Sequence, residues 1–216
     1  MKRVYIYCEG QTEEAFVNAV LYPYFQPQDI YVFPIICTTK RSAGQKFRGG
    51  VTDYGKIRRE LQRLCRSHPQ ALVTTMIDYY AMPPETPGLD SSYMDLMERI
   101  AFVERAVTED IGETNCSFNF LVHEFEAVLF SRPEVFELIT TPQVVEQLEA
   151  VRQSYPTPEH INNSVETAPS KRILSLIPQY RKVGDGVSLA ELIGIDAIRE
   201  ACPHFRAWTD VVLRWH

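Results

Sequence analysis

The chain has 216 residues, of which 45% are apolar and 23% charged, and its formal net charge is -6. A chain of this size can bury a full core without cross-links, so we expect one α/β domain with a helical extension. Five dispersed cysteines without a C-x-x-C pair exclude a zinc ribbon or disulfide framework. With an N-terminal apolar stretch too short for a signal peptide or a membrane span, we expect a cytoplasmic protein.

Short apolar runs alternate with helix-length segments over the first 130 residues, which is typical of parallel strands joined by crossover helices. Enrichment in Val, Ile, Tyr, Phe and Thr predicts strands over residues 3–8, 30–37, 71–78 and 117–122. The intervening segments predict helices over residues 12–25, 52–66 and 93–110. Two long loops follow strand ends, where ligands bind in doubly wound sheets.

Helical segments punctuated by seven prolines make up the rest of the chain. The predicted fold is therefore an α/β domain over residues 1–130, with a parallel sheet flanked by helices. A helical C-terminal extension over residues 131–216 is expected to pack on it.

The first strand leads into a turn with two acids, in the order Cys8-Glu9-Gly10-Gln11-Thr12-Glu13. Glycine allows a sharp turn, and Thr12 can cap a helix whose first turn then holds Glu13 near Glu9. Two carboxylates placed in this way can share a divalent metal. The alternative is that the acids only complement the helix dipole, which explains Glu13 but not Glu9.

Asp78 closes the third predicted strand and is expected at the same sheet edge as Glu9. The alternative for Asp78 is a turn-capping role. Further along, the segment 118–127 runs from a strand into a helix and brings three more polar residues to this edge. Of these, Glu126 is the better candidate for a fourth carboxylate, whereas His123 is interpreted as a satisfied or surface histidine.

Basic residues are concentrated between positions 40 and 66, a segment with nine Lys and Arg residues and two acidic residues. Such asymmetry suits a polyanion on one face, although a solvated surface explains it equally well. The candidate nucleic-acid-binding residues are Lys40, Arg41, Lys46 and Arg48. Two later basic pairs, Lys171-Arg172 and Arg181-Lys182, can bind phosphate or stabilise a leaving oxygen, or can be helix-end charges.

The acidic motifs resemble the Toprim domain, especially that of overcoming-lysogenization-type (OLD) nucleases. Over nearly the whole chain the sequence is similar to a Toprim-like bacterial family of unknown function. This similarity rests on Cys8-Glu9-Gly10-Gln11-Thr12-Glu13, Asp78-Tyr79-Tyr80-Ala81-Met82-Pro83, His123-Glu124-Phe125-Glu126-Ala127, Pro169-Ser170-Lys171-Arg172 and Cys202-Pro203-His204-Phe205.

The resemblance implies a Toprim-like sheet in which Glu9, Glu13 and Asp78 bind Mg²⁺ (or Mn²⁺) for phosphoryl-transfer chemistry. The family has an Asp-x-Asp motif, but this chain has Tyr80 at the position of the second aspartate. Glu124 or Glu126 would therefore have to supply the missing carboxylate. We add Glu126 to the metal ligands. Glu9, Asp78 and Lys171 are the candidate catalytic residues.

The expected function is that of a magnesium-dependent nuclease, which the resemblance places in bacterial antiphage defence beside a separate ATPase. The chain itself lacks the G-x-x-x-x-G-K-[ST] motif of an ATPase. The alternative is a catalytically inactive Toprim-like regulatory or nucleic-acid-binding module, since a fold does not imply an activity. A nucleotidyl transferase of the primase type would need nucleotide-binding features that the sequence does not show.

Overall fold

A parallel β-sheet forms the centre of the protein in a computed structural model that describes residues 1–37, 53–91, 95–161 and 167–215. The strand order is β2-β1-β3-β4, and β5 also pairs with β3. All pairings are parallel, which confirms the predicted α/β class. The strands are β1 (Lys2–Cys8), β2 (Ile30–Ile36), β3 (Leu72–Asp78), β4 (Cys116–Ser117) and β5 (Phe120–Leu121).

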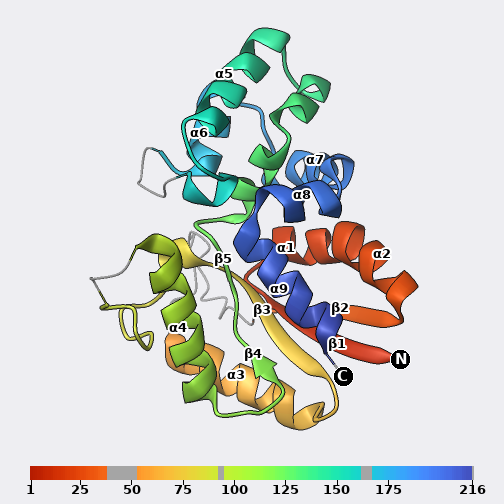
Figure 1. Cartoon of the computed structure of the whole chain (residues 1–216), viewed down its shortest axis with the longest axis vertical. Coiled ribbons are helices and arrows are strands. Elements are labelled where there is room, and N and C mark those ends of the chain that lie inside the picture. The colour runs from red at the N-terminus through yellow and green to blue at the C-terminus, as the bar shows by residue number, and fades with distance from the viewer. Residues whose placement is uncertain (38–52, 92–94, 162–166, 216) are drawn as a thin grey trace, which may run out of the picture.

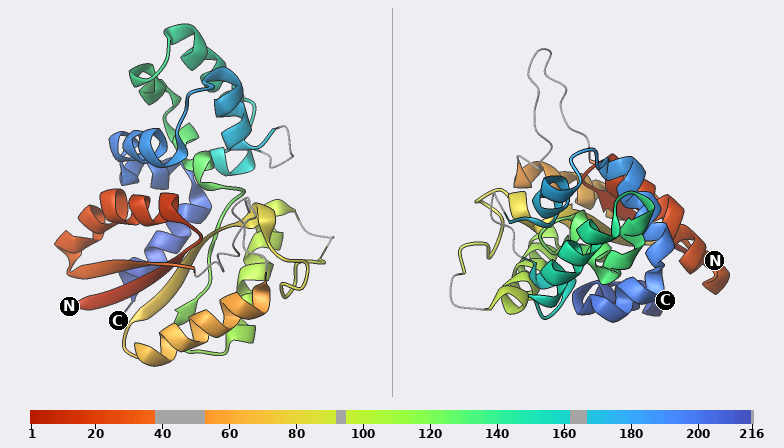
Figure 2. Two further views of the ribbon diagram at one scale, coloured as in Figure 1. Left: turned by 180° about the vertical axis from the view of Figure 1, so that it is seen from behind. Right: turned by 90° about the horizontal axis from the view of Figure 1, so that it is seen from above.

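Helices cover both faces of this sheet (Figures 1 and 2). On one face lie α3 (Tyr54–Ser67) and α4 (Leu96–Ile111), whose apolar residues form one buried cluster with the sheet. On the other face lies a second, larger buried cluster. The helices that contribute residues to this cluster include α1 (Gln11–Phe16), α2 (Tyr22–Phe25), α7 (Val187–Ile193), α8 (Ile195–Ala201) and α9 (Pro203–Arg214).

The predicted helix over residues 12–25 begins one residue earlier and contains a π-helical turn, Val17–Leu21, between α1 and α2. Helix α4 begins later than expected, at Leu96, because the Asp95 carboxylate caps it by accepting hydrogen bonds from the first turn. Residues 52 and 93, the expected starts of two helices, lie outside the described residues.

The fourth predicted strand is divided into β4 and β5. Between them, the Thr75 hydroxyl donates to the Asn119 carbonyl (2.6 Å) and accepts from the Asn119 N–H (2.8 Å). A side chain of β3 therefore replaces the backbone partner that a continuous strand would need.

The segments after residue 130 pack on the sheet as well as on each other. Trp208 of α9 donates its indole N–H to the Thr74 hydroxyl of β3 (2.9 Å), and both residues are buried. The larger buried cluster contains residues from both sides of position 130, and the proposed division into two domains stays a prediction. Helices α5 (Pro142–Gln153) and α6 (Pro169–Leu176) lie farther from the sheet (Figure 1).

Short helical turns complete the described structure. They are the 3₁₀ helices η2 (Gln26–Gln28), η3 (Tyr79–Ala81), η4 (Phe125–Ser131), η5 (Pro133–Leu138) and η6 (Pro158–His160), and the π-helix η7 (Lys182–Gly186). Within the described ranges, no helix combines the length and apolarity needed to cross a membrane. All five cysteines are buried and form no disulfide.

Candidate functional site

Two of the predicted acids meet at the carboxyl edge of the sheet, because β1 and β3 are neighbours that end together. Cys8 of β1 pairs with Met76 of β3, so Glu9 leaves β1 beside the end of β3. There, the Glu9 carboxylate accepts a hydrogen bond from the backbone N–H of Asp78 (3.0 Å). The local turn and the parallel pairing therefore bring together residues that lie 69 positions apart in the sequence.

Glu13 lies in the first turn of α1, where its carboxylate accepts a hydrogen bond from the Gly10 N–H (2.9 Å). This contact holds the turn after β1 closed and leaves Glu13 4% exposed. Burial raises the pKa of the Glu9 carboxyl group, and the nearby charge of Glu13 raises it further. The two acids thus interact electrostatically, as their spacing in the sequence predicts.

Glu126 enters this region from η4 and is only 1% exposed. The Lys182 ammonium lies 3.1 Å from Glu126 Oε2 and 3.8 Å from Asp78 Oδ2. Lys182 is the first residue of η7, far from both acids in the sequence. A lysine from the C-terminal extension therefore lies between acids that the N-terminal part of the chain provides.

These charges shift one another's pKa values. Burial raises the pKa of Asp78 well above its usual range, against the opposing effect of Lys182. Burial also raises the pKa of Glu126 to about 7, again against Lys182. Burial alone would lower the pKa of Lys182, but the surrounding acids, led by Asp78 and Glu126, outweigh it and raise this pKa. Lys182 is therefore held in its positively charged form beside these carboxylates.

Lys182 does not satisfy the hydrogen-bonding capacity of these acids. Within the described residues, no donor has hydrogen-bond geometry to either carboxylate oxygen of Glu126 or to Asp78 Oδ1, and these oxygens are buried. The 3.1 Å contact with Lys182 is close enough for a charge interaction but lacks hydrogen-bond angles. Buried acceptors without a protein donor are uncommon, which distinguishes these carboxylates from the hydrogen-bonded acids elsewhere in the described structure.

The carboxylates do not form a metal site as they are arranged. Among the residues that the structure describes, no group of three or more His, Cys, Asp or Glu side chains is disposed to hold a metal ion. Carboxylate oxygens are the donors that Mg²⁺ prefers, so the donor chemistry suits this ion whereas their positions do not. Among the described residues, the cation within 4 Å of Asp78 and Glu126 is the ammonium of Lys182.

Glu124, the alternative replacement for the second family aspartate, has another role. Its carboxylate accepts hydrogen bonds from the backbone N–H (2.7 Å) and the hydroxyl (2.9 Å) of Ser170, at the start of α6. The neighbouring Lys171 is exposed and makes no ion pair with any described residue. The predicted catalytic lysine is thus not brought to the acids, and Lys182 is there instead.

The interpretation of His123 as a satisfied or surface residue is wrong. His123 is 2% exposed, has a left-handed backbone (φ 66°), and neither ring nitrogen has a hydrogen-bond partner in the described part of the chain. Burial, with the nearby charge of His160, lowers its pKa to about 4. The left-handed turn follows β5, and the His123 carbonyl accepts from the Tyr80 N–H (3.3 Å). His123 therefore shapes the site edge through its backbone.

The candidate nucleic-acid-binding residues Lys40, Arg41, Lys46 and Arg48 lie outside the described residues. The following helix, α3, carries the rest of the basic segment. Four of its basic residues form ion pairs with acids, which are Lys56–Glu60, Arg58–Asp110, Arg59–Asp53 and Arg66–Glu113. The positive charge that the sequence shows is therefore partly neutralised on the α3 side.

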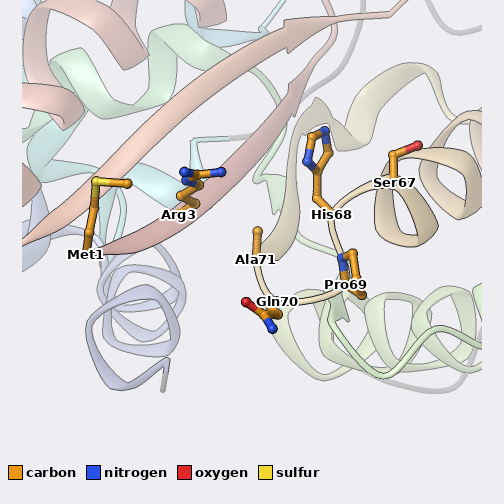
Figure 3. Close-up of a pocket in the computed structure, with 7 residues that line it drawn as sticks. All are labelled: Met1, Arg3, Ser67, His68, Pro69, Gln70 and Ala71. Carbon is orange, nitrogen blue, oxygen red and sulfur yellow. The ribbon is translucent and has the colours of Figure 1, made fainter.

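A pocket opens at the other end of the sheet, lined by Met1, Arg3 and residues 67–71 (Figure 3). It lies where β1 and β3 begin, whereas the acids lie where these strands end. The pocket therefore does not include any of the predicted site residues.

The last family-like motif has a structural role. Glu159, which is 3% exposed, accepts hydrogen bonds from the backbone N–H groups of His204 (3.0 Å) and Phe205 (2.8 Å). These are among the N–H groups that a helix start leaves unpaired, so Glu159 caps α9 from a distant segment. The motif Cys202-Pro203-His204-Phe205 thus fixes α9 rather than contributing a side chain to the acids.

Comparison with known proteins places the chain in a family but attaches no activity to it. The C-terminal region of the Burkholderia pseudomallei OLD protein is a structural match with 22% identity and a TM-score of 0.41, covering 98% of this chain and 99% of that chain. No curated protein matches. Residues 8–213 match the family described as "Domain of unknown function (DUF4276)". Because that match spans nearly the whole chain, the protein belongs to the DUF4276 family.

Proposed function

We propose that this protein is a nuclease that hydrolyses phosphodiester bonds and depends on Mg²⁺ or Mn²⁺. The observation that carries the proposal is the meeting of Glu9, Asp78 and Glu126 with a lysine at the carboxyl edge of a parallel sheet. This edge is where open α/β sheets bind ligands. The Toprim-like order of the acidic motifs supports the same chemistry.

The proposed metal ligands are Glu9, Glu13, Asp78 and Glu126. A divalent ion held by such carboxylates supplies charge stabilisation and an activated water for attack on phosphorus. In the described arrangement the ligands do not fit such an ion, since Lys182 lies between two of them. The proposal therefore requires the acids to gather around the ion when it binds.

Nucleic acid is the proposed substrate and would approach this edge from the loop after β2. We propose that it is bound by Lys40, Arg41, Lys46 and Arg48, with Lys171 as a further phosphate contact. Replacing the four loop residues with alanine should weaken binding and flatten its dependence on salt, because fewer counterions are released. If the salt dependence of binding is unchanged, nucleic acid is bound by another surface of the protein.

We also propose a cytoplasmic role in bacterial antiphage defence with a separate ATPase as partner. This part rests on the resemblance of the motifs to OLD-type nucleases. Expression of the protein with and without an ATPase encoded beside it, followed by phage plating, tests the role. Protection that needs both proteins and is lost in Glu9→Gln supports it, whereas equal plating efficiency in all strains contradicts it.

The competing function is a catalytically inactive Toprim-like module that regulates a partner or binds nucleic acid. Two observations favour it. Tyr80, at the position of the second family aspartate, is 50% exposed and cannot replace a carboxylate ligand. The Lys182 ammonium lies within 4 Å of Asp78 and Glu126 and offsets part of their negative charge.

A cleavage assay separates the two functions. Purified protein is incubated with plasmid, single-stranded DNA and RNA in Mg²⁺ or Mn²⁺, beside Glu9→Gln and an EDTA control. The nuclease proposal expects cleavage by the wild-type protein alone and its loss in both controls. If no substrate is cut while the protein still binds nucleic acid, the protein is a catalytically inactive binding or regulatory module.

A further inference from the structure

We propose that the pocket at the amino edge of the sheet binds a small phosphate monoester (Figure 3). This site is separate from the acids at the carboxyl edge, so the inference does not rest on the proposed nuclease activity. The pocket has a volume of about 420 Å³, which lies within the range of small-molecule sites. Among the described residues, those that line it include Arg3, His68 and Gln70 but no Asp or Glu. A negatively charged ligand would therefore meet donors and no lining carboxylate.

Arg3 and His68 offer donors from opposite sides of this pocket (Figure 3). Within the described ranges, neither the Arg3 guanidinium nor the His68 ring nitrogens form an ion pair or a hydrogen bond. A guanidinium presents paired N–H donors whose geometry matches two oxygens of a phosphate group. Both side chains therefore keep their donors available for a ligand.

The ring of His68 is positioned by stacking. It lies on the ring of Tyr5 in β1, with centroids 4.1 Å apart and planes at 23°, and Tyr5 stacks in turn on Phe33 of β2 (5.3 Å). Arg3 and Tyr5 are two residues apart on one strand, so their side chains share a face of the sheet. The sheet thus carries both Arg3 and the ring that orients His68, which lowers the entropic cost of binding.

The carbonyl groups at the end of α3, which would repel an anion, are already hydrogen-bonded. The side-chain amide of Asn115 donates to the carbonyls of Cys65 (3.3 Å), His68 (3.0 Å) and Ala71 (2.9 Å). The carboxyl end of a helix carries a partial negative charge, and these three contacts offset it. They also hold the segment after α3 in the shape that forms one wall of the pocket.

These donors suit a phosphate group better than a carboxylate. A phosphate monoester carries nearly two negative charges at neutral pH and three acceptor oxygens, so it can contact donors on several sides. A carboxylate has one charge and two oxygens. Met1, Pro69 and Ala71 give the pocket an apolar part that the organic group of the ester can contact. The Met1 ammonium is paired with Asp29 (2.7 Å) and is not needed for binding.

Isothermal titration calorimetry with AMP as the probe tests this inference. Inorganic phosphate and adenosine are titrated in parallel, all with EDTA and without divalent ions, so that the acids at the other edge are not involved. Arg3→Met removes the guanidinium, and His68→Phe removes the ring nitrogens while keeping a ring that can stack on Tyr5. Lys2→Met is the matched control, because it removes a positive charge one residue away, on the opposite face of β1. Melting temperatures show whether each variant is folded.

The expected result is that AMP binds the wild-type protein and Lys2→Met equally well. Arg3→Met and His68→Phe should each bind AMP at least about tenfold more weakly, because each loses a hydrogen bond to a charged group. Adenosine should not bind, since it lacks the phosphate. Inorganic phosphate should bind more weakly than AMP, since it lacks the organic group.

Three results would overturn the inference. The first is that AMP does not bind the wild-type protein, and the second is that it binds folded Arg3→Met and His68→Phe as tightly as wild type. The third concerns the source of the phosphate and uses a 5′-phosphorylated DNA oligonucleotide in the same titration. If the oligonucleotide binds more tightly than AMP and Arg3→Met abolishes this, the occupant is the end of a nucleic-acid strand. None of these results bears on cleavage, which is assayed with Mg²⁺ or Mn²⁺.

Discussion

The contact between His204 and Glu104 joins α9 to α4 and should make stability depend on pH. His204 is in the first turn of α9, and its Nε2 lies 2.9 Å from Glu104 Oε1 of α4, with both side chains 15% exposed. The same Glu104 oxygen accepts the Phe120 N–H (2.7 Å), which holds β5 in place. Glu104 thus links three segments that are distant in sequence.

The sign of the pH effect follows from the pKa of His204. Burial alone would lower this pKa, but the hydrogen bond with Glu104 and its charge outweigh burial and raise it. The folded protein therefore keeps the proton to higher pH than the unfolded chain, in which histidine titrates near pH 6.5. The stabilisation is complete below about pH 6.5 and is lost as the pH rises through the folded-state pKa.

His204→Gln removes the titrating ring while its amide can still donate to Glu104. A hydrogen bond with a charged partner contributes about 1.5 to 3 kcal/mol, and a neutral one about 0.5 to 1.5 kcal/mol. We therefore expect the variant to be less stable by about 1 to 2 kcal/mol at pH 6, and the difference to shrink toward zero at pH 9.

Urea unfolding followed by tryptophan fluorescence at several pH values measures this difference. Glu104→Gln is the partner control and should remove the pH-dependent part, so that adding His204→Gln to it has little further pH effect. A stability difference that stays constant from pH 6 to pH 9 would show that His204 carries no charge in this contact and would refute the reasoning.

Three further changes test other contacts. Glu159→Ala should lower the free energy of unfolding by about 3 kcal/mol, measured in urea, because two N–H groups at the start of α9 lose a charged acceptor. Glu9→Gln should abolish cleavage yet keep or slightly raise the melting temperature, since burial raises the pKa of the Glu9 carboxyl group; unfolding would make Glu9 structural. Gly186→Ala should destabilise by about 1 to 3 kcal/mol because its methyl group would overlap the Tyr180 hydroxyl, and Tyr180→Phe should partly restore stability.

Local patterns in the sequence predict the sheet and the placement of its terminal acids. The apolar runs that end at Cys8 and Asp78 form β1 and β3, and the strands are parallel neighbours. Once two strands are parallel and in register, the residues that follow them lie at one edge, so Glu9 and Asp78 meet without any further information. The division of the fourth strand was not predictable, because it depends on the side chain of Thr75 from β3.

Only the tertiary structure decides which lysine lies beside the acids. Arg181 and Lys182 are adjacent and chemically similar, yet the first binds Asp185 on the surface and the second lies beside Asp78 and Glu126. Lys171 fitted the sequence motif equally well and is exposed. Nothing in a local pattern distinguishes these cations, since the choice depends on how the C-terminal helices pack against the sheet.

The net effect of the charged residues is likewise only partly predictable from the sequence. The basic segment between positions 40 and 66 is evident from composition, but the acids that neutralise much of α3 include Asp110, in the last turn of α4, and Glu113, just after α4. Strand and helix formation depend on side chains a few residues apart, which the sequence displays directly. Electrostatic interaction depends on distance in space and on burial, and both are decided only when the chain folds.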